Sequence, residues 1–209
     1  EDLIGNIWDD RPALSCEPVM ELSEKWAGRS RADKIREIRS KLKEKDADLF
    51  VLTSLDDIAW LLNVRGNDIS YVPVVLSYLA LTQEQCIWFL QEEVVDDTLR
   101  EYLQKNGITT RPYEAFYEYV KTLENQTILL NRAVVNTKIC NNLPESAQMI
   151  DAEDPTLEMK AVKNETEISN TRKAHVKDAV AMCRFMYWLK KNVGKIPMTE
   201  ISASDYLES

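Results

Sequence analysis

Residues 48–66, DLFVLTSLDDIAWLLNVRG, constrain the fold of this chain more than any other stretch of it. Residues 49–52 (LFVL) are a short apolar run of strand formers, which is typical of a strand covered on both faces of an α/β sheet. Ser54 follows, and its hydroxyl can cap the start of a helix. Asp57 lies in the first turn of that helix, where its carboxylate can bond back to the backbone and interact favourably with the helix dipole. The stretch therefore predicts a buried strand that leads into a short helix.

The end of this helix holds two residues of interest for function. Asn63 and Gly66 suit the left-handed or otherwise permissive backbone that ends a helix, and we expect positive φ at Gly66. Two residues near the end of the helix have no structural role assigned by this pattern: Trp60, which is large and amphipathic, and Arg65, which is charged. Spacing alone favours a packed tryptophan and a solvated arginine at these positions over a binding role.

Strands and helices alternate along the chain up to about residue 150. Ser30 can cap a helix that runs to about residue 45, because apolar residues recur there at helical spacing. The runs 72–82 and 86–90 are strand-like and are joined by a short polar turn, which predicts a hairpin. Further strands are expected at about 108–113, 127–131 and 147–150, and further helices at about 96–106, 114–123 and 136–142. This order predicts an α/β fold, a mixed β-sheet flanked by helices.

The composition changes near Asp151, where an acidic segment ends at Pro155 and strands cease. We place a domain boundary between about 153 and 163. Residues 165–192 are continuously compatible with a helix, which Asn164 or Thr166 can cap. Its apolar stripe is large enough to need a partner. We expect that partner to be a second copy of the chain, in a homo-oligomer, or else the separate remainder of a longer protein. The stripe contains Ile168, Ala179, Met182, Met186 and Leu189.

Charge and hydropathy exclude two classes of partner. The formal net charge is −9 at pH 7, and the chain has no basic stripe of the kind that binds nucleic acid. One local group of basic residues is interleaved with acids and predicts a solvated helix face. That group is Arg29, Arg31, Lys34, Arg36, Arg39 and Lys41. Since no stretch approaches the roughly 18 to 20 apolar residues that cross a membrane, we expect neither a nucleic-acid nor a membrane partner.

The chain offers few residues for catalysis or metal binding. Its four cysteines lie far apart and form no zinc motif, and they fit reduced thiols of a cytosolic protein, although an even count leaves disulfides open. His175 is the only histidine, and on an apolar helix face a histidine is more often a packing residue than a catalyst. Neither a nucleophile elbow nor a glycine-rich phosphate loop occurs. We therefore expect no catalytic residue, metal ligand or cofactor site in this chain.

Four separated motifs occur in the order that they have in one known family. They are IWDDRP (residues 7–12), LDDIAWLLNVRG (55–66), MKAVKN (159–164) and RKAHVKDAVA (172–181). With them the chain resembles the three-domain Xaa-Pro aminopeptidases, which belong to the creatinase/prolidase family of pita-bread metallopeptidases. The resemblance covers essentially the whole chain.

The resemblance implies a domain plan. Residues 1–28 would be a connector from a missing preceding domain, 29–155 a creatinase N-terminal-like domain, and 156–209 the truncated start of a pita-bread catalytic domain. The metal ligands and catalytic histidines of the family follow the point where this chain stops, so none can be carried over. We therefore expect this chain to be a piece of a longer polypeptide, and inactive by itself.

The resemblance also implies an activity for the parent protein. It would be a cytoplasmic enzyme that removes the N-terminal residue preceding proline from a peptide, with two divalent metal ions, manganese or zinc. Trp60 and Arg65 would lie at the rim of its substrate groove, where Arg65 can meet a peptide carboxylate through a charge-assisted fork. The alternative for Arg65 is that it bonds carbonyl groups of its own domain.

Two other functions stay open. A pita-bread relative can lose its metals and act as a protein-binding module, as in a histone-chaperone subunit of this architecture, and an acidic charge is compatible with basic partners. The other alternative is a sister hydrolase such as prolidase or creatinase. The connector motif IWDDRP counts against that second alternative.

Overall fold

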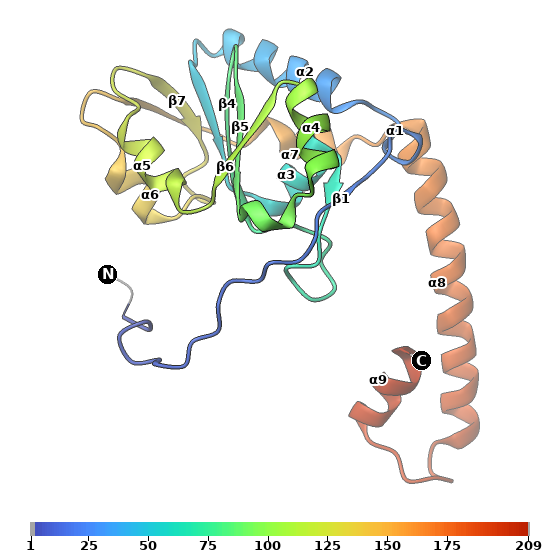
Figure 1. Cartoon of the computed structure of the whole chain (residues 1–209). Coiled ribbons are helices and arrows are strands. Elements are labelled where there is room, and N and C mark those ends of the chain that lie inside the picture. Colours follow the sequence, from blue (N-terminus) through green and yellow to red (C-terminus); the bar gives the residue numbers. More distant parts are fainter. Residues whose placement is uncertain (1–2, 209) are drawn as a thin grey trace. The chain divides into compact units, whose positions relative to one another are not determined.

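The computed structural model describes residues 3–208 (Figure 1). The chain divides into two compact units, Glu1–Val162 and Lys163–Ser209. Residues 1, 2 and 209 lie outside the described part, and with them the first two positions of the expected connector and the last position of the chain.

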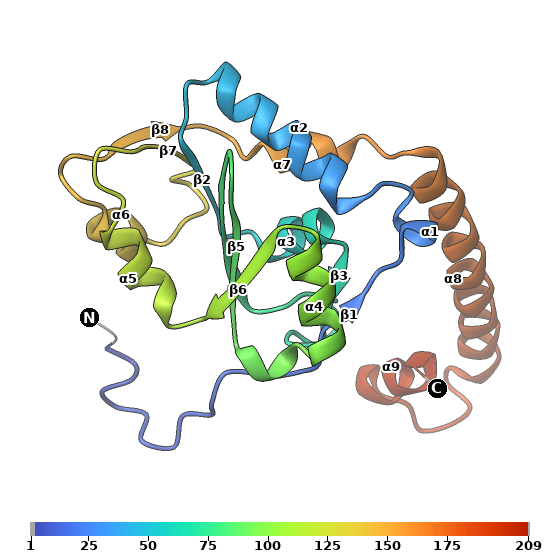
Figure 2. The ribbon, with the colours of Figure 1, turned by 45° about the horizontal axis from the view of Figure 1, so that its top comes forward.

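The first unit is built on a six-stranded mixed sheet with the strand order β6-β5-β4-β2-β7-β8 (Figure 2). Strand β4 is antiparallel to both of its neighbours, whereas β2, β7 and β8 pair in parallel with one another and β5 pairs in parallel with β6. The strands are β2 (Leu49–Leu52), β4 (Ser77–Thr82), β5 (Cys86–Leu90), β6 (Ile108–Pro112), β7 (Thr127–Leu130) and β8 (Gln148–Asp151). The mixed α/β sheet expected from the sequence is confirmed.

Helices cover both faces of the sheet, so that two apolar cores form. In β2, Phe50 and Leu52 face one core while Leu49 and Val51 face the other, and all four side chains are completely buried. This explains the uninterrupted apolar run of β2, because a strand covered on both faces has no polar side. Helices α2 (Arg31–Glu44), α3 (Leu55–Leu62), α4 (Asp97–Lys105) and α7 (Pro155–Ala161) lie on the first face, and α5 (Ala115–Lys121) and α6 (Thr137–Asn142) lie on the second (Figure 2).

Capping side chains start several of these helices where the sequence predicts them. Ser30 Oγ accepts a 3.0 Å hydrogen bond from Asp33 N at the start of α2. Asp96 Oδ1 accepts a 2.7 Å hydrogen bond from Leu99 N at the start of α4. Such bonds satisfy backbone N–H groups that have no partner within the helix.

The first strand of the hairpin is shorter than expected, and a small second sheet was not expected at all. The prediction of a strand from residue 72 is wrong, because Pro73 has no N–H group to donate and Leu76 N donates to Asp68 Oδ2 instead of to a strand. In the segment expected to be only a connector, β1 (Met20–Glu21) pairs antiparallel with β3 (Val64–Arg65), and α1 (Glu24–Ala27) follows. The short 3₁₀ helix η1 (Glu92–Val94) lies between β5 and α4.

The second unit consists of α8 (Glu165–Asn192) and α9 (Glu200–Glu208). Asn164 starts α8 with a capping box, in which Asn164 Oδ1 accepts from Glu167 N and Glu167 Oε2 accepts from Asn164 N. The two helices meet through stacked rings of Trp188 and Tyr206, whose centroids are 3.8 Å apart. None of the described side chains of α8 and α9 is buried, and none of the described helices has the length and apolar character to cross a bilayer.

Candidate functional site

Trp60 lies in the last turn of α3, and it belongs to the core of the first unit. Its side chain is 9% exposed, and the ammonium of Lys34 lies 4.2 Å from the centroid of a Trp60 ring. Lys34 Nζ also donates to Trp60 O and to Asn63 Oδ1, each at 2.6 Å. A buried ammonium is tolerated only when such acceptors replace water. The end of α3 is thus fixed to α2 by a charge on the inside of the protein.

This arrangement corrects the solvated helix face expected for the basic group of α2. Lys34 is 1% exposed and Arg31 is 3% exposed. The guanidinium of Arg31 lies over the ring of Tyr102, and Arg31 Nη2 forms an ion pair of 2.8 Å with Glu21 Oε1. Two members of the group therefore point into the unit, because the aromatic rings, carbonyl oxygens and carboxylates that they bind lie there.

Arg65 follows the left-handed residue Asn63, whose φ is 52° as expected for the end of α3. Arg65 Nη1 donates to Ala59 O at 3.2 Å and to Val64 O at 2.7 Å. The guanidinium thus bonds carbonyl groups of its own unit, which is the alternative weighed for it above. A place for Trp60 and Arg65 at the rim of a substrate groove stays a prediction.

Gly66 is required for a different reason from the one expected. Its φ is not positive; instead, a Cβ atom at Gly66 would lie 2.7 Å from Val75 Cγ2 and 2.8 Å from Val74 O. Distances this short are overlaps. Gly66 therefore allows the two ends of the loop between β3 and β4 to touch, and the expected left-handed conformation is wrong.

The start of α3 is held by charges that come from far along the chain. Ser54 makes no side-chain cap: its Oγ donates to Asp56 Oδ1 at 2.8 Å, so the expected capping bond is wrong. Asp57 does not bond back to its own helix either. Its Oδ2 accepts a 2.7 Å hydrogen bond from Thr156 Oγ1, and Lys160 Nζ forms ion pairs with Asp57 Oδ1 and Asp56 Oδ2. Sequence reasoning missed this contact, which joins α3 to α7.

The titration behaviour of this charged group follows from burial and pairing. Burial by itself would lower the pKa of Lys160, but its hydrogen bonds to Asp56 and Asp57 outweigh burial and raise that pKa. Burial, reinforced by the negative charge of Asp57, raises the pKa of Asp154 to about 6. Asp154, which precedes α7, therefore takes up a proton in mildly acidic solution.

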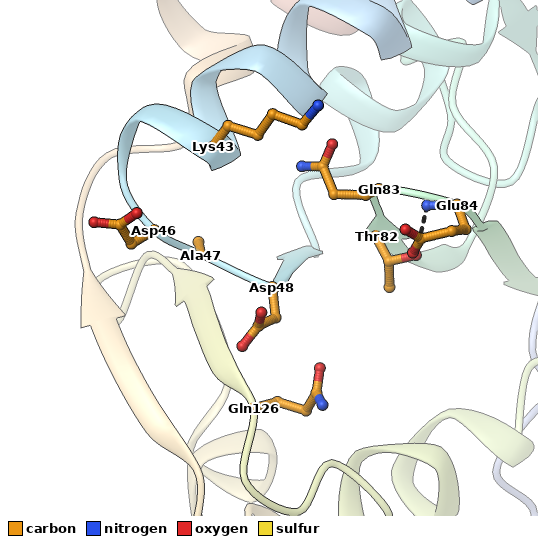
Figure 3. Close-up of a pocket in the computed structure, with 8 residues that line it drawn as sticks. All are labelled: Lys43, Asp46, Ala47, Asp48, Thr82, Gln83, Glu84 and Gln126. Carbon is orange, nitrogen blue, oxygen red and sulfur yellow. Dashed lines mark hydrogen bonds between the residues drawn. The ribbon is translucent and has the colours of Figure 1, made fainter.

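A hollow of about 620 Å³ lies at the amino ends of β2 and β7, whereas α3 follows the carboxyl end of β2 (Figure 3). Asp48 and Gln126, which precede β2 and β7, line it together with Thr82, the last residue of β4, and Glu84 in the turn that follows. Asp48 Oδ2 accepts a 2.8 Å hydrogen bond from Thr127 N. In α/β sheets ligands bind at the carboxyl ends of parallel strands, whereas this hollow is at their amino ends. We therefore assign it no binding role.

The possible metal-binding side chains of the described residues lie apart from one another. Among residues 3–208, no three side chains of His, Cys, Asp or Glu come close enough together to hold an ion. His175 is exposed on α8, so the packing role expected of it is not seen in this chain. The four thiols are not joined in disulfides.

Comparison with known proteins places the chain in a family. The sequence model of the creatinase/prolidase N-terminal domain matches residues 10–167. The probable Xaa-Pro aminopeptidase P of Chaetomium globosum is 34% identical over 222 aligned residues, which cover 100% of this chain and 36% of that protein. The chain thus spans about a third of the length of this relative.

Solved structures agree with the sequence match. The X-prolyl aminopeptidase of Caenorhabditis elegans, a cytosolic enzyme with a di-nuclear active site, matches 99% of this chain and 35% of its own at 30% identity, with a TM-score of 0.89. The Xaa-Pro dipeptidase of Bacillus anthracis has the same fold, with a TM-score of 0.58 at 16% identity over 86% of this chain and 48% of its own. The resemblance to Xaa-Pro aminopeptidases is confirmed, and the chain belongs to the creatinase/prolidase N-terminal domain family.

Proposed function

We propose that this chain is the non-catalytic part of an Xaa-Pro aminopeptidase, which removes the N-terminal residue preceding proline from peptides. The observation that carries the proposal is the match of 99% of the chain to the C. elegans X-prolyl aminopeptidase, with a TM-score of 0.89 at 30% identity. Because that match covers only 35% of the enzyme, the reacting groups would come from the remaining part of such a protein. The role of this chain is then to form a wall of the substrate groove.

Two divalent metal ions, manganese or zinc, would serve the complete protein. The di-nuclear active site of the C. elegans enzyme supports the number of ions. The donor atoms in the described part of this chain do not converge on a metal position, so the ligands would lie outside it. The chain by itself is then inactive and binds neither manganese nor zinc tightly.

The domain plan, the compartment and the assembly belong to the same proposal. Residues 29–155 would form the creatinase N-terminal-like domain, and residues 156–209 would begin the pita-bread domain. The enzyme would be cytoplasmic, as the C. elegans protein is. The exposed apolar side chains of α8, among them Val176 at 66% and Met182 at 46%, support a homo-oligomer.

A paired assay tests the proposal. A protein that extends this chain to the full length of its relatives and the chain 1–209 are each given an Xaa-Pro tripeptide, before and after chelation and re-addition of manganese or zinc. We expect metal-dependent release of the first residue by the long protein only. Absence of cleavage by the metal-loaded long protein would refute the proposal that it is an Xaa-Pro aminopeptidase. Cleavage that co-purifies with chain 1–209, or tight binding of manganese to it in calorimetry, would refute the non-catalytic assignment.

A further inference from the structure

The loop between β3 and β4, residues 66–76, is drawn in teal in Figure 1. The side chain of Asp68 closes this loop at its base. Asp68 Oδ2 accepts a 2.7 Å hydrogen bond from Leu76 N at the far end of the loop. Asp68 Oδ1 accepts from Ser15 Oγ at 2.8 Å and from Glu17 N at 3.1 Å. A carboxylate with three such donors fixes the base of the loop to the segment before β1.

The tip of this loop holds a large aromatic side chain in solvent. Ile69 and Val72 form a β-bridge, and Val72 N donates to Ile69 O at 3.1 Å. Between them, Tyr71 has a φ of 66° and is 90% exposed. The other described residues with a side chain and positive φ are Asp46, Asn63 and Asn125, whose short polar side chains tolerate this conformation. Tyrosine has no such tolerance, and strained residues of this kind cluster at functional sites.

The loop leads into β4 at one edge of the sheet, and that edge is where α/β proteins place their ligand-binding loops. The loop enters β4 at Ser77, which pairs with Leu90, the last residue of β5. Further along β4, Leu79 pairs with Leu52, the last residue of β2. The loop therefore lies at the carboxyl ends of the parallel strands, which is the edge where α/β sheets bind their ligands.

We infer that Tyr71 is a specificity-determining residue, whose ring contacts the pyrrolidine ring of a proline-containing peptide. The inference rests on the proposed function. Proline-containing segments are recognised by aromatic side chains, and a tyrosine supplies a large apolar face with few rotatable bonds. Ile69 and Val72, at 41% and 43% exposed, extend that apolar surface on both sides. Because Asp68 holds the base, the ring is presented without the entropic cost of ordering a flexible loop.

Arg65 supports this loop from the end of β3. Arg65 ends β3 immediately before the loop, and its bonds to Ala59 O and Val64 O hold the strand that leads into it. Gly66, which tolerates no side chain, then brings the two ends of the loop together. The motif at the end of α3 therefore positions the loop, and Tyr71 contacts the peptide.

Kinetics of the full-length enzyme test this assignment with the variants Tyr71→Ala, Tyr71→Gly and Tyr71→Phe. We expect kcat/KM for an Xaa-Pro tripeptide to fall about tenfold or more in the Ala and Gly variants, mainly through KM, and to stay within about twofold in the Phe variant. Tyr71→Gly also relieves the positive φ, so we expect its urea midpoint to rise. Lower kcat/KM in a more stable protein separates substrate contact from folding.

Asn125→Gly is the matched control, because it relieves a φ of 55° far from the loop in sequence and should leave kcat/KM unchanged. Unchanged kcat/KM in both Tyr71→Ala and Tyr71→Gly would overturn the inference while the activity of the wild type upheld the proposed function. A variant with unchanged kinetics per subunit but a lower mass in light scattering would instead assign Tyr71 to a contact between copies, and would also overturn it. A metal-loaded wild type that cleaves no Xaa-Pro peptide would refute the proposed function, and the inference with it.

Discussion

Thr156 Oγ1 donates a 2.7 Å hydrogen bond to Asp57 Oδ2, although the two residues are 99 positions apart in the sequence. Thr156 is 0% exposed and Asp57 is 2% exposed. The ion pair between Lys160 and Asp57 lies beside this bond. A carboxylate is buried at such low exposure only while its donors remain in place. The bond therefore couples α3, which follows β2, to α7, the last helix of the first unit.

Replacing Thr156 by valine tests this coupling. Thr156→Val keeps the volume of the side chain but removes Oγ1, so that Asp57 Oδ2 stays buried without its donor. We expect the free energy of unfolding of the chain to fall by about 1–3 kcal/mol in urea denaturation. Thr122→Val is the control, because the Thr122 hydroxyl bonds Tyr119 O on the surface and its loss should change stability by less than about 0.5 kcal/mol. Equal effects of the two substitutions would contradict the prediction.

Asp154 should make the stability of the chain depend on pH in a defined direction. Its pKa is about 6 in the folded chain and about 3.9 in an unfolded one, so the folded state holds the proton more tightly. The stabilisation that this proton provides is present below about pH 4 and is lost as the pH rises to about 6. We expect Asp154→Asn to match the wild type near pH 4 and to exceed it by about 1–2 kcal/mol at pH 7.

Denaturation curves at pH 4, 5, 6 and 7 measure this difference. Glu153→Gln, which removes the same charge from an exposed neighbour, is the control and should show no such rise between pH 4 and pH 6. A difference between Asp154→Asn and wild type that is constant across these pH values would show that the carboxyl of Asp154 does not titrate there.

Gly66→Ala should destabilise the chain by overlap with its neighbours. The new Cβ would meet Val75 Cγ2 and Val74 O, and we expect a loss of about 1–3 kcal/mol. Gly107→Ala gives the contrast, because Gly107 has a φ of 73° with no atom within 4 Å of the added Cβ, so that only backbone strain of about 1 kcal/mol remains.

A double variant separates the two causes. Val75→Ala removes Cγ2, so the loss in Gly66→Ala/Val75→Ala should be smaller than the sum of the two single losses, whereas Gly107→Ala/Val75→Ala should be additive. Urea midpoints of the wild type and the five variants decide this. Full additivity in both pairs would mean that Val75 does not limit the space at Gly66.

The apolar stripe of α8 should drive association of the chain. Met182 and Met186 are 46% and 40% exposed, and burying such a side chain contributes about 1.5–3 kcal/mol. We expect Met182→Glu/Met186→Glu to lower the mass measured by light scattering, with little change in the unfolding midpoint of the α/β unit. Ser169→Glu/Asn170→Glu adds the same charge to α8 outside the stripe and should leave the mass unchanged. A wild-type chain that is monomeric at high concentration would contradict the prediction.

Features encoded by neighbouring residues were predictable from the sequence. The run LFVL matches β2 (Leu49–Leu52) because all four of its side chains are buried, and periodicity together with a capping residue places α8 at Glu165–Asn192. In both cases the physical cause lies within the segment itself. Strand alternation and caps are local properties, so a single sequence is enough to show them.

Features that depend on remote partners were not predictable. Lys34 looks like any lysine of a surface helix until Trp60 O, 26 positions away, accepts from it. Tyr71 looks like any loop residue in the sequence, because its positive φ and its exposure are seen only in the folded loop, whose base Asp68 bonds to the remote residues Ser15 and Glu17. Trp60 and Arg65 were singled out from their motif, but their contacts depend on how α2, α3 and β3 meet.

Chemical modification of the buried amine of Lys34 would report whether α2 and α3 are packed together. Acylating reagents attack a lysine amine only when it is accessible and has lost its proton, and Lys34 Nζ is held by Trp60 O and Asn63 Oδ1 at 1% exposure of the residue. Exposed lysines of α2 such as Lys43 should be modified quickly, whereas Lys34 is reached only when α2 separates from α3. The ratio of modified Lys34 to modified Lys43 in a mass spectrum therefore measures how often this part of the core opens.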